Sequence, residues 1–185
     1  MEFLVGPQDF TATLEKALTE IDPLWRDYPG LIIAGSHKPE LVAQKLEALK
    51  NAREGRVPTL GICLGMQLMA IEYARDELNL DATSEEFGDE GLRIIERLPE
   101  TRVGMRPVNG QMESHWHNFA LLSGFVTSLM SSNFNLMFEG PIVEEMRLKG
   151  HPFYVGVQYH PEYQSSKDKP HPLLAEFIEV CKKQK

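Results

Sequence analysis

The strongest constraint on the fold is an alternation of short apolar segments and amphipathic segments upstream of Leu80. Apolar runs predict three buried strands, at Glu2–Gly6, Gly30–Gly35 and Thr59–Cys63. Apolar residues at helical spacing predict three helices between and after them, at Thr11–Ile21, Glu40–Asn51 and Gly65–Leu78. Strands that alternate with helices form right-handed βαβ units, so we expect a parallel sheet flanked by helices.

The pattern changes after Leu80, where shorter strands follow one another and several are expected to pair antiparallel. They are predicted at Arg93–Ile95, Val103–Val108, Glu113–Leu122, two runs between Phe134 and Leu148, and Phe153–His160, with a closing helix at Pro172–Val180. A chain of 185 residues is long enough for a substantial core and has the usual length of one domain. The sequence therefore predicts a single α/β domain over residues 1–185, mainly parallel, with antiparallel strands in its C-terminal half.

Composition narrows the classes of function. The formal net charge is −8, and the lysines and arginines are not clustered, which argues against nucleic-acid or anionic-membrane partners. The N-terminal residues do not resemble a signal peptide, and no apolar run approaches the roughly 18 residues of a membrane span. Cys63 and Cys181 lie far apart and form no disulfide framework, which favours a thiol-reducing, cytoplasmic location.

Gly61-Ile62-Cys63-Leu64-Gly65 has the pattern of a nucleophile elbow between a strand and a helix. Such a turn holds the middle residue in a strained backbone conformation and presents its side chain at the carboxyl end of the sheet. The helix that starts beside Cys63 should favour a thiolate, and the backbone N–H of Leu64 could donate to an oxyanion. The alternative is that Cys63 is a small buried apolar residue, which is the usual role of a free cysteine.

A thiol nucleophile needs a base, and the base needs a group that orients it. His160-Pro161-Glu162 follows a predicted strand and supplies both. His160 could take the Cys63 proton and later protonate a leaving amine, while Glu162 could hold the imidazole and stabilise its charged form. A single histidine near a strand end is more often structural, but the combination with the elbow favours catalysis.

The motifs GICLGMQ and GVQYHPEY resemble the two signatures of class I (triad) glutamine amidotransferases, and most closely those of the glutaminase domain of CTP synthase. The resemblance implies a flavodoxin-like three-layer α/β fold and hydrolysis of glutamine through a γ-glutamyl thioester, with no cofactor. It also implies that Cys63, His160 and Glu162 form the triad. Gln67 and Glu86 match positions that contact the substrate glutamine.

Two departures from this family concern the partner domain and the oxyanion loop. The family's synthetase domain is absent from this sequence, and no phosphate-binding loop is present, so CTP synthesis would require a separate synthetase partner. The glycine-rich oxyanion loop of the family is replaced by Ile33-Ala34-Gly35-Ser36-His37. A backbone donor could still come from Gly35 or Ser36, although His37 adds bulk to the loop.

A third departure concerns the strand that anchors the glutamine carboxylate in the family. Its three arginine positions are occupied here by Ser114, Trp116 and Asn118. Because neither Trp nor Asn replaces a bidentate arginine–carboxylate contact, glutamine should bind poorly unless another cation substitutes. We expect Trp116 to line a more apolar pocket. His115 and His117 suggest a metal site, but the family has both without metal, so none is expected.

Three functions remain open from the sequence. The leading one is a Cys-His-Glu amidohydrolase that acts on glutamine or a related small-molecule amide. The second is a hydrolase of another amide that works without a synthetase. The third is a regulatory or binding module that has kept the fold, and a homo-oligomer is compatible with each.

Overall fold

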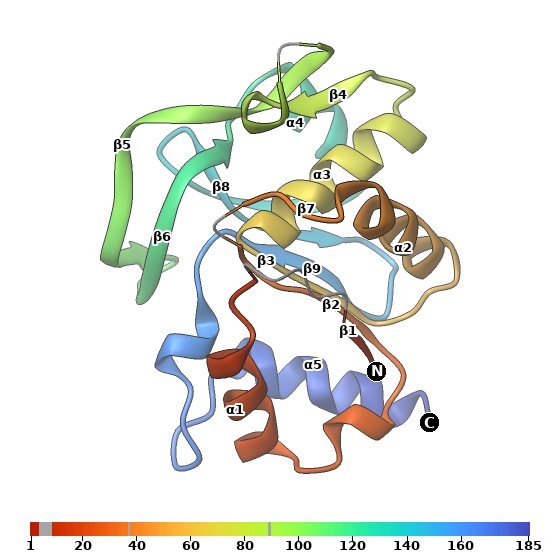
Figure 1. The fold of residues 1–185 in the computed structure, drawn as a ribbon, viewed down its shortest axis with the longest axis vertical. Coiled ribbons are helices and arrows are strands. Elements are labelled where there is room, and N and C mark those ends of the chain that lie inside the picture. Colours follow the sequence, from red (N-terminus) through yellow and green to blue (C-terminus); the bar gives the residue numbers. More distant parts are fainter. Residues whose placement is uncertain (4–8, 37, 89) are drawn as a thin grey trace.

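A computed structural model describes residues 1–3, 9–36, 38–88 and 90–185 (Figure 1). Its central sheet has six strands in the order β1-β2-β3-β9-β8-β7. The first four strands of this order are parallel, namely β1 (Glu2–Phe3), β2 (Leu31–Ile33), β3 (Thr59–Ile62) and β9 (Tyr154–Val157). The last two pair antiparallel, namely β8 (Ile142–Leu148) and β7 (Phe134–Glu139). The predicted mainly parallel sheet with antiparallel strands in the C-terminal half is therefore confirmed.

Helices cover both faces of this sheet and make a three-layer α/β fold (Figure 1). Helices α2 (Val42–Glu54) and α3 (Leu64–Asp76) pack on one face, and α1 (Ala12–Ile21) and α5 (Pro172–Lys183) pack on the other. The alternation along β2 explains the two cores, because neighbouring strand residues face opposite sides. Leu31 and Ile33 join the core beneath α2 and α3, whereas Ile32 joins the core beneath α1 and α5.

A second sheet lies beside the carboxyl end of the first. It contains β4 (Ala82–Ser84), which is parallel to β5 (Leu92–Val108), and β6 (Gln111–Leu121), which pairs antiparallel with β5. Asn109 and Gly110 connect β5 to β6 with φ angles of 48° and 78°, the left-handed conformation that tight hairpin turns require. Figure 1 shows this hairpin extending away from the helical layers.

Some predicted boundaries were wrong. The strands predicted at Arg93–Ile95 and Val103–Val108 are parts of one strand, β5, whose register shifts between Arg97 and Arg102. The strand predicted at Phe153–His160 ends at Val157, before the 3-10 helix η3 (Pro161–Gln164). Strand β4 and helix α4 (Phe125–Met130) were not predicted. The first predicted strand is observed over Glu2–Phe3, and its remainder lies outside the described residues.

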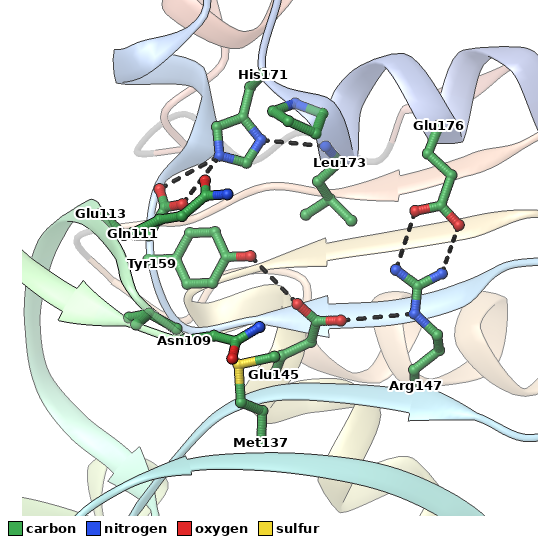
Figure 2. A pocket seen from close by; sticks show the side chains of 12 residues that line it. Asn109, Gln111, Glu113, Met137, Glu145, Arg147, Tyr159, His171, Leu173 and Glu176 are labelled. Atoms are coloured by element: carbon green, nitrogen blue, oxygen red, sulfur yellow. Dashed lines mark hydrogen bonds and ion pairs between the residues drawn. The ribbon is translucent and has the colours of Figure 1, made fainter.

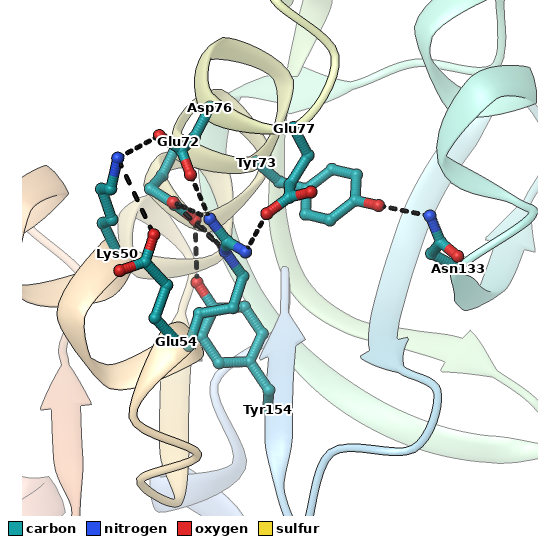
Figure 3. Close-up of polar contacts among 9 residues, drawn as sticks. Lys50, Glu54, Glu72, Tyr73, Asp76, Glu77, Asn133 and Tyr154 are labelled. Carbon is teal, nitrogen blue, oxygen red and sulfur yellow. Dashed lines mark hydrogen bonds and ion pairs between the residues drawn. The ribbon is translucent and has the colours of Figure 1, made fainter.

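Ion pairs fix the helical layer that carries the elbow. Arg53 of α2 donates to Glu72 of α3 at 2.9 Å and to Asp76 at 2.7 Å, and Tyr154 of β9 donates to Glu72 at 3.3 Å (Figure 3). Lys50 also contacts Asp76. These contacts join the C-terminal halves of α2 and α3 to each other and join α3 to the sheet. Over the described part of the chain, no helix has the length and apolar character needed to cross a bilayer.

Candidate active site

Cys63 lies at the junction of β3 and α3 in a strained backbone conformation. Its φ and ψ are 52° and −106°, in a region that side-chain-bearing residues rarely adopt. The flanking glycines allow this turn to pack. A Cβ on Gly61 would lie 2.4 Å from the Met69 sulfur, and a Cβ on Gly65 would lie 2.1 Å from the Ile33 carbonyl oxygen. The Gly-x-Cys-x-Gly pattern therefore reflects close contacts among β2, β3 and α3.

The thiol of Cys63 sits at the first turn of α3, where backbone N–H groups have no intrahelical acceptor. Its backbone N–H donates to the Val157 carbonyl at 2.7 Å, which joins the end of β3 to the end of β9. Its Sγ lies 3.9 Å from the Trp116 carbonyl oxygen of β6. Cys63 is only 5% exposed. The thiol is thus enclosed between the carboxyl end of the main sheet and the hairpin.

His160 and Glu162 lie together just beyond the adjacent strand β9. The Nδ1 of His160 is 2.7 Å from Glu162 Oε1, and the His160 backbone N–H donates to the Ser114 carbonyl at 2.8 Å. The Nε2 of His160 is buried and has no hydrogen-bond partner within the described part of the chain. Burial lowers the pKa of His160, but the nearby Cys63 and Glu162 outweigh it and raise that pKa to about 10. This arrangement favours an imidazolium.

Gly35 brings the loop after β2 against this pair. A Cβ on Gly35 would lie 2.8 Å from His160 Cε1 and 3.3 Å from Cys63 Cβ. Gly35, Cys63 and His160 are therefore mutual neighbours, as the oxyanion-loop assignment from sequence requires. Ser36 follows directly and accepts from the Lys38 backbone N–H through its hydroxyl. The expected obstruction by His37 lies outside the described residues.

A cavity opens in front of Cys63. Its wall includes six of the residues singled out from the sequence: Ser36, Cys63, Leu64, Gln67, Glu86 and Trp116. The amide nitrogen of Gln67 donates to the Phe119 carbonyl at 3.0 Å and to Gln158 Oε1 at 3.1 Å, which fixes its orientation. Burial raises the pKa of Glu86, and Arg97 opposes that shift. The structure thus brings the elbow and the three predicted substrate-binding residues, Gln67, Glu86 and Trp116, to one cavity.

Four further wall residues were not identified as site residues from sequence, namely Phe10, His117, Asn118 and Phe119. The Phe10 ring stacks on Trp116 at 6.2 Å and meets His160 edge-on at 5.9 Å. Phe10 is held there by its backbone N–H, which donates to the Gly35 carbonyl at 2.8 Å. The preceding Asp9 forms a fully buried ion pair with Lys45 at 2.7 Å. No local pattern predicts these contacts, because each joins distant parts of the chain.

His115 and His117 point away from Trp116, which is 52% exposed, and are themselves buried. The Nδ1 of His115 is 3.4 Å from the Nε2 of His117, and the Nδ1 of His117 is 2.9 Å from the Phe119 carbonyl. Burial, with the nearby Arg102, lowers the pKa of His115 to about 3 and that of His117 to about 4. Over the described ranges, no group of three or more metal-ligating side chains occurs.

These neutral histidines predict acid sensitivity. A folded-state pKa of about 4 for His117 lies below the ordinary value of 6.5, so its stabilising contribution is complete above pH 6.5 and is lost as the pH falls. At pH 4 this loss amounts to about 3 kcal/mol. We expect the free energy of unfolding, measured by urea denaturation, to fall from pH 6.5 to 4 and to fall less steeply in His117→Gln. Equal slopes in both proteins would contradict this assignment; pH 7.5 to 8.5 serves as the control range.

A second cavity, of about 200 Å³, lies between β8 and α5 (Figure 2). Its charged side chains are paired with one another. His171 contacts Glu113 at 3.2 Å, and Arg147 contacts Glu145 at 3.5 Å and Glu176 at 2.6 Å. These pairs account for the charged groups of this cavity.

Comparison with known proteins identifies the family to which this chain is similar. The family model described as Glutamine amidotransferase class-I matches residues 9–180. A CTP synthase from Methanoculleus marisnigri is 36% identical over 187 residues, which cover 86% of this chain and 35% of that protein. A CTP synthase from Ruminiclostridium cellulolyticum is 31% identical over 190 residues, which cover 88% of this chain and 36% of that protein. The chain therefore spans about a third of the length of these relatives.

Solved structures share the fold. The glutaminase domain of Trypanosoma brucei CTPS, with bound acivicin, superposes with a TM-score of 0.76 at 22% identity, covering 97% of this chain and 77% of that one. A protein from Thermoplasma acidophilum that is described as a GMP synthase component superposes with a TM-score of 0.61 at 18% identity, covering 98% of this chain and 94% of that one. These similarities support the three-layer fold.

Proposed function

Because this chain belongs to the class I glutamine amidotransferase family, we propose that it hydrolyses the side-chain amide of glutamine to glutamate and ammonia. The observation that carries the proposal is the strained Cys63 at the N-terminus of α3, with the His160–Glu162 pair on the neighbouring strand end. A buried thiol that only fills space has no need of a φ of 52° or of a histidine with a buried, unpaired Nε2 among its described neighbours.

The proposed reaction follows acyl-transfer chemistry. His160 takes the Cys63 proton, the thiolate adds to the amide carbon, and the resulting oxyanion is stabilised by backbone N–H groups at Leu64 and at Gly35 or Ser36. The imidazolium of His160 then protonates the leaving nitrogen, and ammonia departs from a thioester. Water activated by His160 hydrolyses the thioester and restores the thiol. Glu162 orients the imidazole and stabilises its cationic form throughout.

Ammonia produced in this site would serve an amination reaction. The chain is similar to CTP synthases and corresponds to about a third of their length. We therefore propose that the ammonia is consumed by a synthetase domain or subunit of the CTP synthase type. The chemistry of the Cys63 site itself is independent of that acceptor.

Hydrolysis of a different amide is the second candidate function. Its support is the wall of the cavity, where Trp116 and Phe10 stack on each other and Asn118 occupies a position that is arginine in the resembling family. An apolar wall would favour an amide with an apolar substituent. A purely regulatory role is the third candidate, and it predicts no turnover of any amide.

The test compares glutamine, other small amides and a glutamine-like diazo-ketone label on the wild-type chain and on Cys63→Ala. We expect wild type to release ammonia from glutamine and to take one label at Cys63, located by mass spectrometry, and Cys63→Ala to do neither. Label uptake with turnover of another amide instead of glutamine would favour the second candidate. Absence of both turnover and label would refute the enzymatic proposals.

A further inference from the structure

The cavity at Cys63 carries a negative charge on its wall and needs a cation if it is to hold an amino acid. Of the described residues that line it, none is a lysine or an arginine. His117 is neutral at pH 7 because its pKa is lowered to about 4, chiefly by burial. Glu86 supplies a carboxylate, which suits an ammonium group. The α-carboxylate of glutamine therefore has no charged partner among these wall residues themselves.

The side chain of Arg97 lies immediately behind this wall. Arg97 is directly opposite Phe119 in the β5–β6 pairing, and its guanidinium carbon is 4.8 Å from the centre of the Phe119 ring. Its backbone N–H donates to Glu85 Oε2 at 2.8 Å, which ties β5 to the short 3-10 helix η2 (Glu85–Phe87) that carries Glu86. The backbone of Arg97 is thus held at the edge between Phe119 and Glu86, both of which line the cavity.

A guanidinium that stacks on an aromatic ring keeps its in-plane N–H donors available. The stacking uses the face of the group, whereas a carboxylate binds its edge through two parallel hydrogen bonds. Arg97 is solvent-exposed, so its long side chain can turn toward the cavity without leaving a buried charge behind. The neighbouring Asn118 accepts a hydrogen bond from the Thr101 hydroxyl, so this pair offers only neutral groups.

We propose that Arg97 supplies the carboxylate subsite of the cavity, and that with Glu86 it forms a clamp of opposite charges for the α-amino-acid end of the amide substrate. This inference rests on the proposed function and specifies its substrate class: amides that carry a free α-ammonium and a free α-carboxylate. Trp116 and Asn118 on β6 occupy positions that are arginine in the resembling family. Arg97, on the paired strand β5, would supply the missing cation.

Binding to the full chain carrying Cys63→Ala tests the clamp without turnover. Isothermal titration would compare glutamine with 4-aminobutanamide, which lacks the α-carboxylate, and with glutaramate, which lacks the α-amino group. We expect Arg97→Ala to weaken glutamine and glutaramate about tenfold to a hundredfold and to leave 4-aminobutanamide unchanged, since only the first two carry the carboxylate. Arg97→Lys should recover part of the affinity for both.

Arg26→Ala is the matched control. Arg26 is also an exposed arginine stacked on an aromatic ring, 4.4 Å from Trp25, but it lies in the segment after α1 and does not line the cavity. It should leave all three affinities unchanged. Equal weakening of all three ligands in Arg97→Ala, or no weakening of glutamine, would overturn the clamp while leaving glutamine hydrolysis by wild type intact. Failure of wild type to hydrolyse glutamine and of the Cys63→Ala chain to bind it would instead remove the proposed function and the clamp together.

Discussion

Replacing Gly65 with alanine is expected to lower the free energy of unfolding by about 3 kcal/mol or more, because the added methyl group has no space. Its Cβ would lie 2.1 Å from the carbonyl oxygen and 2.9 Å from the carbonyl carbon of Ile33. Both atoms belong to the backbone of β2, so relief requires α3 to separate from the sheet. Urea denaturation followed by the fluorescence of the buried Trp25 measures the loss.

Gly124→Ala is the control for this substitution. No atom lies within 4 Å of a Cβ at Gly124, and its φ of 174° is extended backbone that alanine adopts freely. Its free energy of unfolding should stay within about 1 kcal/mol of wild type. A Gly65→Ala protein as stable as Gly124→Ala would show that α3 and β2 do not pack as closely as the structure has them.

The same close packing explains why the first half of the fold was predictable. Its signals are local in the sequence: the glycines of the elbow, the apolar runs of β2 and β3, and the helical spacing of apolar residues in α2 and α3. These apolar residues pack into the core between the helices and the sheet. The strands β1, β2 and β3 lie in chain order, but α1 and α2 cover opposite faces of the sheet, so right-handed βαβ units do not account for both connections. The sequence therefore predicts the layer that holds Cys63, although not where each strand ends.

The hairpin and the cavity wall could not be predicted in the same way. Strand β5 continues through the register shift between Arg97 and Arg102 because β6 pairs with it before and after the shift. No local sequence pattern predicts this pairing of β5 with β6. Phe10 contacts Trp116 and His160 where its backbone bonds to Gly35 and the preceding Asp9 is paired with Lys45, far along the chain. Residues that would perform chemistry stand in short local motifs, whereas residues that would select the substrate meet through long-range contacts.

Bond cleavage and substrate selection would therefore depend on different parts of the chain. A motif such as Cys63 with His160 and Glu162 specifies how a bond can be cleaved, and similar motifs serve many substrates. Selectivity would depend on Glu86, Arg97 and Trp116, which come from three different elements. The absence of the family's arginines from β6 does not by itself exclude glutamine as a substrate. In the proposed clamp, Arg97 of the neighbouring strand β5 would supply the cation to the same cavity.

Among substitutions that keep both Cys63 and His160, the largest kinetic effect is expected from Glu162→Gln. The Glu162 carboxylate lies 2.7 Å from His160 Nδ1 and helps to raise the pKa of His160, against the opposing effect of burial. A neutral amide cannot stabilise the imidazolium and can present the wrong hydrogen-bonding partner to Nδ1. We expect kcat/KM for glutamine to fall about 10²-fold to 10⁴-fold, measured as ammonia release.

The pH dependence separates this role from a loss of folding. Loss of the negative charge at Glu162 lowers the pKa of His160, so the imidazolium is lost at a lower pH and the alkaline limb of the kcat/KM profile moves downward in pH. Glu113→Gln is the matched control, because Glu113 forms another buried carboxylate–histidine pair, 3.2 Å from His171. An unmoved limb in Glu162→Gln, or an equal shift in Glu113→Gln, would exclude Glu162 as the partner that sets the charge of His160.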